Sequence, residues 1–177
     1  YNLLVQGISG SYSNMNLDGA TISSLYFDNS ANPSVFDGGS ITLTNAPSPY
    51  TLIGMNLPAI VTYTSGAGLF EDYVIVRSTL VEDLTLNAEP LGVGSYWYVS
   101  TDLDVASGRT LTVGPGTLIK VENGFIIDVL SSGTLNVNGS AGNEVIITSF
   151  SDDNVGNPAA SSASVGDWEG LYFRAGS

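Results

Sequence analysis

Short apolar segments recur along the second half of the chain and are separated by Gly, Asn, Asp and Ser. Within them apolar and polar residues alternate, which is the period of a β-strand whose two faces meet different surroundings. No stretch of ten or more residues keeps apolar positions at helical spacing between plausible caps. The pattern predicts an all-β chain, with strands in its second half at residues 103–105, 111–113, 118–121, 126–129, 135–137 and 145–148.

One stretch of this pattern repeats at a fixed distance. The sequence DVASGRTLTVG at residues 104–114 aligns with DVLSSGTLNVN at residues 128–138, an offset of 24 residues with six of eleven positions identical. Fixed-period self-similarity is the signature of a stacked architecture in which each repeat packs on its neighbours. Three strands per period predict one turn of a three-sided parallel coil, each turn about 4.8 Å above the last.

The repeat also predicts which side chains fill the core. Leu111 aligns with Leu135, and Val113 aligns with Val137, so that like residues stack in columns that face inward. Glycines at the corner positions permit the positive φ that a sharp corner needs. An aspartate in place of Leu135 is therefore expected to prevent folding, because it buries an unpaired charge.

The first half of the chain has no clean 24-residue phase. Strand-like segments occur in it at residues 16–28, 39–45, 73–77 and 84–86. They predict either distorted β-helix coils or a small β-sandwich that ends near residue 99. We therefore divide the chain into a β-rich segment at residues 1–99 and parallel β-helix coils at residues 100–177.

Charge and composition exclude several classes of function. Seventeen acidic residues face four basic ones, for a net charge of −13, which excludes nucleic-acid binding as a main task. The chain has no cysteine and no histidine, which counts against thiol, zinc and histidine-based catalysis. No apolar run is long enough to predict a transmembrane helix, so no membrane insertion is expected.

Five short sequence motifs follow one another in the second half of the chain. They are TLTVGPGTLIK at 110–120, GTLNVNG at 133–139, VIITS at 145–149, SDDN at 151–154 and GDWEGLYF at 166–173. In these motifs residues 100–177 resemble the pectate-lyase-like, right-handed parallel β-helix segments of large prokaryotic secreted and surface proteins. The resemblance implies that fold and an extracellular or cell-surface location in a prokaryote, and it implies no single activity.

The densest group of oxygen ligands comprises residues 151–154 with Asp167 and Glu169. Hard oxygen ligands at short spacing are typical of calcium sites. The same pattern is also typical of a solvated loop between two strands, and the spacing is not that of an EF-hand. Both interpretations stay open for Asp152, Asp153 and Asp167, and we assign no metal or cofactor.

Two adjacent acidic pairs are candidates for glycosidase chemistry: Glu71 with Asp72, and Glu82 with Asp83. Glycosidases need two carboxyl groups about 5–9.5 Å apart. Neighbouring residues on a strand point to opposite faces, so each pair is poorly built for that work, although a pairing of Asp72 with Asp83 stays open. We assign no catalytic residue and predict that the chain is not an enzyme.

Polysaccharide lyases on this scaffold generally abstract a sugar proton with an arginine or lysine beside bound calcium. The β-helix half offers only Arg109, Lys120 and Arg174 for that role. Arg109 falls at a predicted turn, and an acidic surface repels polyuronates.

Aromatic side chains are the remaining candidates. Tyr96, Trp97 and Tyr98 would stack on sugars if exposed, but alternation along a strand places Trp97 opposite the two tyrosines, so that one side is expected to be buried. Trp168 is expected at a core or corner position. Asn138 begins an Asn-Gly-Ser sequence that fits the N-glycosylation pattern and is weak evidence by itself.

These observations favour an extracellular structural or adhesive module, a subunit of a filament or surface layer that assembles through open β ends. The alternative is a carbohydrate-active or carbohydrate-binding β-helix protein. The expected partners are copies of the same chain or neighbouring repeats, with a polysaccharide as the second choice. Apolar residues at 3–5 and 171–173 lie near the two ends of the chain without a proline or charge cluster that would block strand pairing.

Overall fold

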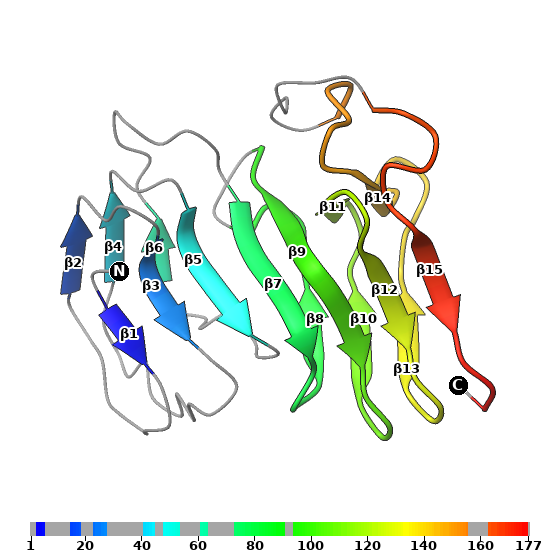
Figure 1. The fold of residues 1–177 in the computed structure, drawn as a ribbon. Helices are drawn as coiled ribbons and strands as arrows, with labels where there is room; N and C mark the ends of the chain where they lie inside the picture. The colour runs from blue at the N-terminus through cyan, green and yellow to red at the C-terminus, as the bar shows by residue number, and fades with distance from the viewer. Residues whose placement is uncertain are drawn as a thin grey trace.

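The computed structural model of the chain contains β-strands that pair in parallel (Figure 1). It describes residues 73–90, 94–155 and 163–176, together with Asp18 and the backbone of six strands between residues 3 and 63. No helix occurs in these parts of the chain, and thus none that is long and apolar enough to cross a membrane. The predicted all-β class is confirmed.

The strands are short, as the alternating segments predict. Those before residue 70 are β1 (Leu3–Val5), β2 (Met15–Asp18), β3 (Ser23–Phe27), β4 (Ile41–Thr44), β5 (Ser48–Ile53) and β6 (Val61–Tyr63). Those after it are β7 (Tyr73–Thr79), β8 (Leu84–Leu86), β9 (Tyr96–Val105), β10 (Thr110–Val113), β11 (Leu118–Val121), β12 (Ile126–Val129), β13 (Thr134–Val137), β14 (Ile146–Ser149) and β15 (Gly170–Phe173). Each strand predicted in the second half is present, the first as the end of the longer β9.

The strands stack into coils with three sides. One edge of β9 pairs with β7, while its other edge pairs first with β11 and then with β12. Behind them β10 lies between β8 and β13, with Leu111 opposite both Leu84 and Leu135 (Figure 1). The result is a parallel β-helix of about 3 turns in residues 73–149. It confirms the predicted stacking of Leu111 with Leu135.

Parallel pairing extends into the first half. β1, β3 and β5 join the same sheet as β7, with Tyr50 opposite Val74, while β2, β4 and β6 form a separate parallel sheet. A β-sandwich is built from antiparallel sheets, so this pairing favours the distorted-coil alternative. Residue 99 lies inside β9, and the division of the chain at residue 99 stays a prediction.

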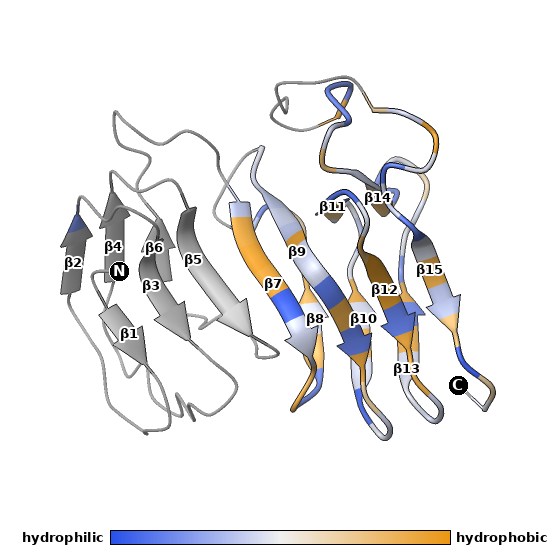
Figure 2. Cartoon of the chain, in the orientation of Figure 1, coloured by the Kyte–Doolittle hydropathy of each residue, from blue (hydrophilic) through white to orange (hydrophobic). Residues whose placement is uncertain are grey.

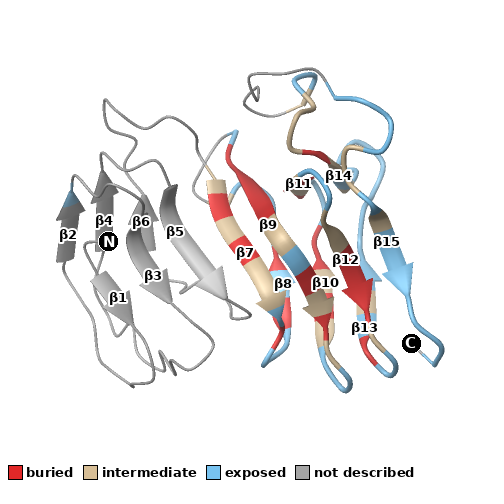
Figure 3. Cartoon of the chain, in the orientation of Figure 1, coloured by how far each residue is buried: buried red, intermediate tan, exposed pale blue. Residues whose placement is uncertain are grey.

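The core lies between the sheets and is made of aliphatic columns with one tryptophan (Figures 2 and 3). Inward residues of successive coils stack on one another, as Val76, Val99 and Val121 do. The column that includes Leu111 is buried up to β10, but Leu135 is only partly buried and Val137 is 49% exposed. The prediction that Val137 is buried is wrong, because no described strand lies over β13.

One corner of the helix grows from coil to coil. β7 and β9 run through it without a break, and their register shifts there, because Val76 lies opposite Val99 but Ser78 lies opposite Leu103, so that β9 has the extra residues. In the next coil residues 122–125 separate β11 from β12, and in the last coil residues 150–169 separate β14 from β15. We call residues 150–169 the corner insertion. The ladder resumes beyond it, since β15 pairs in register with β12.

Candidate functional site: the corner insertion and the open end

Asp152 anchors the first part of the corner insertion. The Thr148 hydroxyl donates to its Oδ2 at 2.7 Å, and the backbone N–H of Asn154 donates to its Oδ1 at 3.0 Å. The Lys120 ammonium donates to the backbone carbonyl of Asp152 at 2.9 Å. Asp152 therefore ties the insertion to β14 through its side chain and to β11 through its carbonyl.

Asp167 fastens the return of the insertion in the same way. Its Oδ2 accepts hydrogen bonds from the Ser149 hydroxyl at 3.2 Å and from the Ser164 backbone N–H at 2.8 Å. Its backbone carbonyl accepts the N–H of Gly124 at 2.8 Å, which joins the insertion to the corner of the coil below. The two aspartates thus hold both ends of the insertion against the coils.

The calcium hypothesis gains no support from these contacts. The carboxylates of Asp152 and Asp167 are occupied by hydrogen-bond donors of the chain, while Asp153 and Glu169 are exposed. Among the residues that the structure describes, no three acidic side chains gather in an arrangement that would hold a metal ion. The described contacts therefore favour the loop interpretation.

A prediction follows for Asp152. The hydrogen bond from Thr148 first, and that from the Asn154 backbone second, lower the pKa of Asp152 below its ordinary value. Since the folded pKa lies below the unfolded value of about 3.9, the carboxylate stabilises the fold above that pH. This contribution is lost as the pH falls through the folded pKa. We expect hydrogen exchange at residues 148–155 to accelerate in acid, beyond the intrinsic pH effect.

The same experiment has a matched control. Asp152→Ala should accelerate exchange in this segment at neutral pH, whereas Asp153→Ala, at the exposed neighbour, should leave exchange unchanged. Equal exchange in both variants would contradict the anchoring role of Asp152.

An aromatic cluster lies against the outer face of β9, beside the insertion. Tyr73 contacts the rings of Tyr96 and Tyr98, with centroids 5.6 and 5.0 Å apart, and Phe150 of the insertion contacts Tyr98 at 4.5 Å. The fully buried Lys120 ammonium lies 5.0 Å from the centroid of the Tyr96 ring. Lys120 is therefore held by a cation–π contact and by the Asp152 carbonyl, inside the protein.

This cluster changes the interpretation of the aromatic triplet. Trp97 belongs to the core and donates its Nε1–H to the Asn87 carbonyl at 2.7 Å. Tyr96 and Tyr98 on the opposite face are also buried, although the alternation predicts burial for one side only. The reason is that the outer face of β9 has a cover of its own, which includes Phe150. None of the three rings forms an exposed sugar-stacking surface in this structure.

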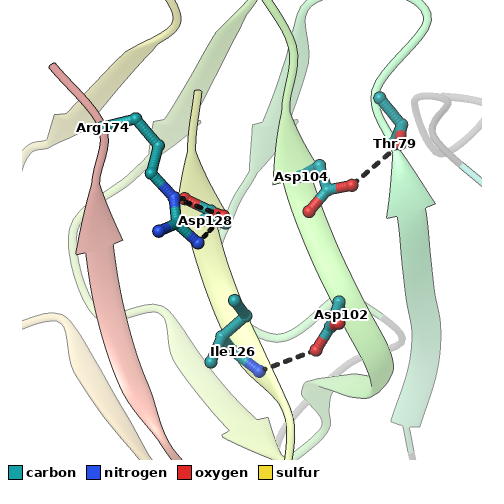
Figure 4. A network of polar contacts seen from close by, with 6 residues as sticks. All are labelled: Thr79, Asp102, Asp104, Ile126, Asp128 and Arg174. Atoms are coloured by element: carbon teal, nitrogen blue, oxygen red, sulfur yellow. Dashed lines mark hydrogen bonds and ion pairs between the residues drawn. The ribbon is translucent and has the colours of Figure 1, made fainter. Parts of the chain in front are cut away.

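Polar residues stack along the outer face of the side that the second part of β9 and β12 form (Figure 4). Asp104 lies opposite Asp128 in the ladder and accepts a hydrogen bond from the Thr79 hydroxyl at 3.0 Å. The Arg174 side chain, 52% exposed, binds the buried Asp128 carboxylate through Nη2 at 2.7 Å and through Nε at 2.9 Å to both oxygens. The hydrogen bond to Asp128 raises the pKa of Arg174. The pair fastens the end of β15 to β12.

The other predicted candidates are scattered. Glu82 is exposed, Asp83 accepts a hydrogen bond from the backbone N–H of Thr110, and Arg109 is exposed at a corner. Trp168 packs against the core, which confirms its predicted position. Glu71 and Asp72 lie outside the described residues.

The described end of the helix at β13, β14 and β15 is open. Each of these strands pairs with one strand only among the residues that the structure describes, so the second edge of each has no partner strand there. We call these three edges the open end. Residues that continue the core columns are exposed there, namely Val137, Leu171 and Phe173, the last at 61% (Figure 3). Ile146, on the outward face of β14, is exposed as well.

A hollow of about 410 Å³ lies beside β13, and it could not be predicted from the sequence. Its lining is mostly small and aliphatic: Val137, Gly139, Ser140, Ala141, Glu144 and Val145. The exposed Asn138 adjoins it. The hollow extends the apolar surface of the open end past the end of β13.

No protein-family model, curated protein or solved structure matches the chain. The resemblance to prokaryotic surface proteins therefore stays a prediction, and the structure identifies the chain by its fold alone, a parallel β-helix.

Proposed function

We propose that the chain is an extracellular structural module that assembles end to end through its open end. The observation that carries the proposal is the exposure of the apolar residues Ile146, Leu171 and Phe173, on strands that each pair with one described strand only. The other edge of such a strand presents N–H and C=O groups to which another strand can bind.

The physical basis is a difference in burial between β15 and the strand beneath it, β12. Leu171 and Phe173 lie opposite Ile127 and Val129, which are fully buried, yet no described strand covers them in turn. Covering an apolar side chain of this size stabilises an assembly by about 1.5–3 kcal/mol. A contact between opposite ends of a helix of parallel strands does not close on itself, so it produces filaments.

The composition supports an extracellular setting. A chain without cysteine, with a net charge of −13, is suited to a surface exposed to solvent and to its neighbours. The carbohydrate alternative lacks a comparable observation, because the Tyr96–Tyr98 rings that motivated it are buried.

The test is to block the open end by charge. Leu171→Lys combined with Phe173→Lys should convert assemblies into monomers, measured by light scattering and electron microscopy at increasing protein concentration. Burying two unpaired ammonium groups in the contact costs several kcal/mol, enough to reduce association by more than a hundredfold.

The matched control is Ser107→Lys with Asn123→Lys, which adds the same charge at two exposed corners away from the open end. The control should assemble like the unchanged protein. The proposal fails if the unchanged protein stays monodisperse at high concentration, or if both double variants assemble equally well.

A further inference from the structure

The dipeptide Asn-Gly occurs twice in the chain, and both copies lie at corners of the β-helix. Asn123 and Gly124 lie between β11 and β12, while Asn138 and Gly139 follow β13. All four residues are exposed. The side chain of an asparagine that precedes glycine can react with the next backbone nitrogen, because glycine has no Cβ that would shield this nitrogen. The two copies therefore offer the same chemistry in two different surroundings.

The backbone nitrogen of Gly124 is held by a hydrogen bond. Its N–H donates to the carbonyl of Asp167, in the corner insertion, at 2.8 Å. The N–H of Asn123 donates to the Glu122 carboxylate at 3.0 Å. To reach the Asn123 side chain, the Gly124 nitrogen has to turn away from the Asp167 carbonyl, so this hydrogen bond must open first. The corner insertion therefore protects Asn123.

The backbone nitrogen of Gly139 has no such partner. Among the described residues its N–H meets no hydrogen-bond acceptor. The N–H groups on either side of it are used, since that of Asn138 donates to the Val113 carbonyl at 2.9 Å. The N–H of Ser140 donates to the Asn143 carbonyl at 3.1 Å. Gly139 also lines the hollow beside β13, so the nitrogen that reacts has space next to it.

The freedom of this nitrogen is a property of the corner itself. The register of β10 with β13, continued by two residues, places Gly139 over Pro115, which has no N–H at all. The ladder therefore needs no N–H at this position. Exposure of the corner does not require an uncovered coil either. Asn87 lies below Gly114 and Asn138 in the same column, and it is exposed although the next coil lies over it.

We propose that Asn138 is a self-modifying site, at which the folded protein converts this asparagine into aspartate and isoaspartate without a second protein. The Gly139 nitrogen attacks the side-chain carbonyl carbon of Asn138 and forms a C–N bond, which closes a succinimide ring. The side-chain nitrogen leaves as ammonia and takes the proton that Gly139 loses. Water then adds to one of the two ring carbonyls and breaks its bond to nitrogen, which leaves one new carboxylate.

The product changes the corner in two ways. In isoaspartate the main chain runs through the side-chain carbons, so the backbone gains one methylene just after β13. The new carboxylate also adds to the charge of Glu144, which lines the same hollow. The backbone N–H of Gly142 donates to Glu144 at 3.0 Å and lowers its pKa, so Glu144 is ionised at neutral pH. The corner therefore becomes more acidic and less regular as the protein ages.

The test follows both asparagines in one sample. The intact protein is incubated at mildly alkaline pH in water enriched in heavy oxygen, digested with chymotrypsin, which cuts between the two sites at Phe125, and examined by mass spectrometry. The acid formed at Asn138 should carry the heavy oxygen and accumulate faster than at Asn123. The ratio of the two rates should exceed that of the same protein unfolded in urea by about threefold or more, since one hydrogen bond must open at Asn123 alone.

Two variants identify the protecting contact. Asp167→Ala removes the carboxylate that ties the corner insertion to β14, and should accelerate the reaction at Asn123 by about threefold or more while the rate at Asn138 stays the same. Asp153→Ala, at an exposed position of the same insertion, is the matched control and should change neither rate.

The proposal is overturned if the folded protein forms no acid at Asn138 under conditions in which the unfolded protein does. It is also overturned if the ratio of the two rates is the same in the folded and the unfolded protein. An unchanged rate at Asn123 in Asp167→Ala would refute the hydrogen bond to Gly124 as the cause of the difference.

Discussion

Leu111→Asp is expected to abolish the cooperative fold. Leu111 is fully buried between Leu84 and Leu135, in the middle of its column. A carboxylate at this position has no partner and no path to water, and burying it costs several kcal/mol. Because the total stability of a domain is about 5–15 kcal/mol, far-UV circular dichroism should show a chain that is largely unfolded or lacks a sharp melting transition.

Leu111 and Leu135 belong to the same column but differ in burial, and this difference provides the controls. Leu111→Ala should lower stability by about 2–5 kcal/mol while the fold is kept. Leu135→Asp should cost much less than Leu111→Asp, since Leu135 is only partly buried at the last strand, and this revises the expectation drawn from the repeat alone. Equal melting temperatures for the two aspartate variants would contradict the observed end of the column at β13.

Lys120→Glu is expected to be the second most damaging single change. The Lys120 ammonium is fully buried against the Tyr96 ring and donates to the Asp152 carbonyl. A glutamate in this place replaces a cation–π attraction by repulsion and turns a hydrogen bond into a contact between two acceptors. Breaking such a buried polar arrangement costs about 3–5 kcal/mol, which thermal or chemical unfolding measures directly.

Lys120→Met is the matched control, since methionine has a similar length and no charge. Replacing a buried charge by an apolar residue of similar volume is often close to neutral. We expect a melting temperature near that of the unchanged protein, with faster proteolysis within the corner insertion, because the contact to Asp152 is gone. A loss of stability as large as that of Lys120→Glu would show that the charge itself, and not its fit, holds this region.

The repeat predicted the coils well because it records the ladder directly. The match between Leu111 and Leu135 is both a sequence alignment and a hydrogen-bonded register, so the strands and the inward columns follow from the sequence alone. Exposure at Val137 could not be predicted in the same way. The burial of an inward residue depends on whether another strand lies above it, and alternation within a strand contains no such information.

The contacts on the outer faces of the coils could not be predicted from the sequence for a different reason. Phe150 helps to cover Tyr98, and Arg174 binds Asp128 from 46 residues away. Arg174 follows the corner insertion, which breaks the 24-residue spacing from which neighbours can be counted, and Phe150 belongs to that insertion and not to a repeated strand. The sequence pointed to Asp152 and Asp167 as oxygen ligands, but their partners, Thr148 for Asp152 and Ser149 for Asp167, could be recognised only from the structure.

The corner insertion has a consequence for which changes of sequence the chain can tolerate. β14 ends at Ser149 and β15 begins only at Gly170, yet β15 pairs in register with β12, with Val129 opposite Phe173. The length of the insertion is therefore not constrained by the coils, provided that its two ends are tied down as Asp152 and Asp167 tie them. A foreign peptide grafted between those two anchors should be displayed on the side of the helix without disturbing the strands beneath it, which makes this corner a natural site for diversification and for engineering.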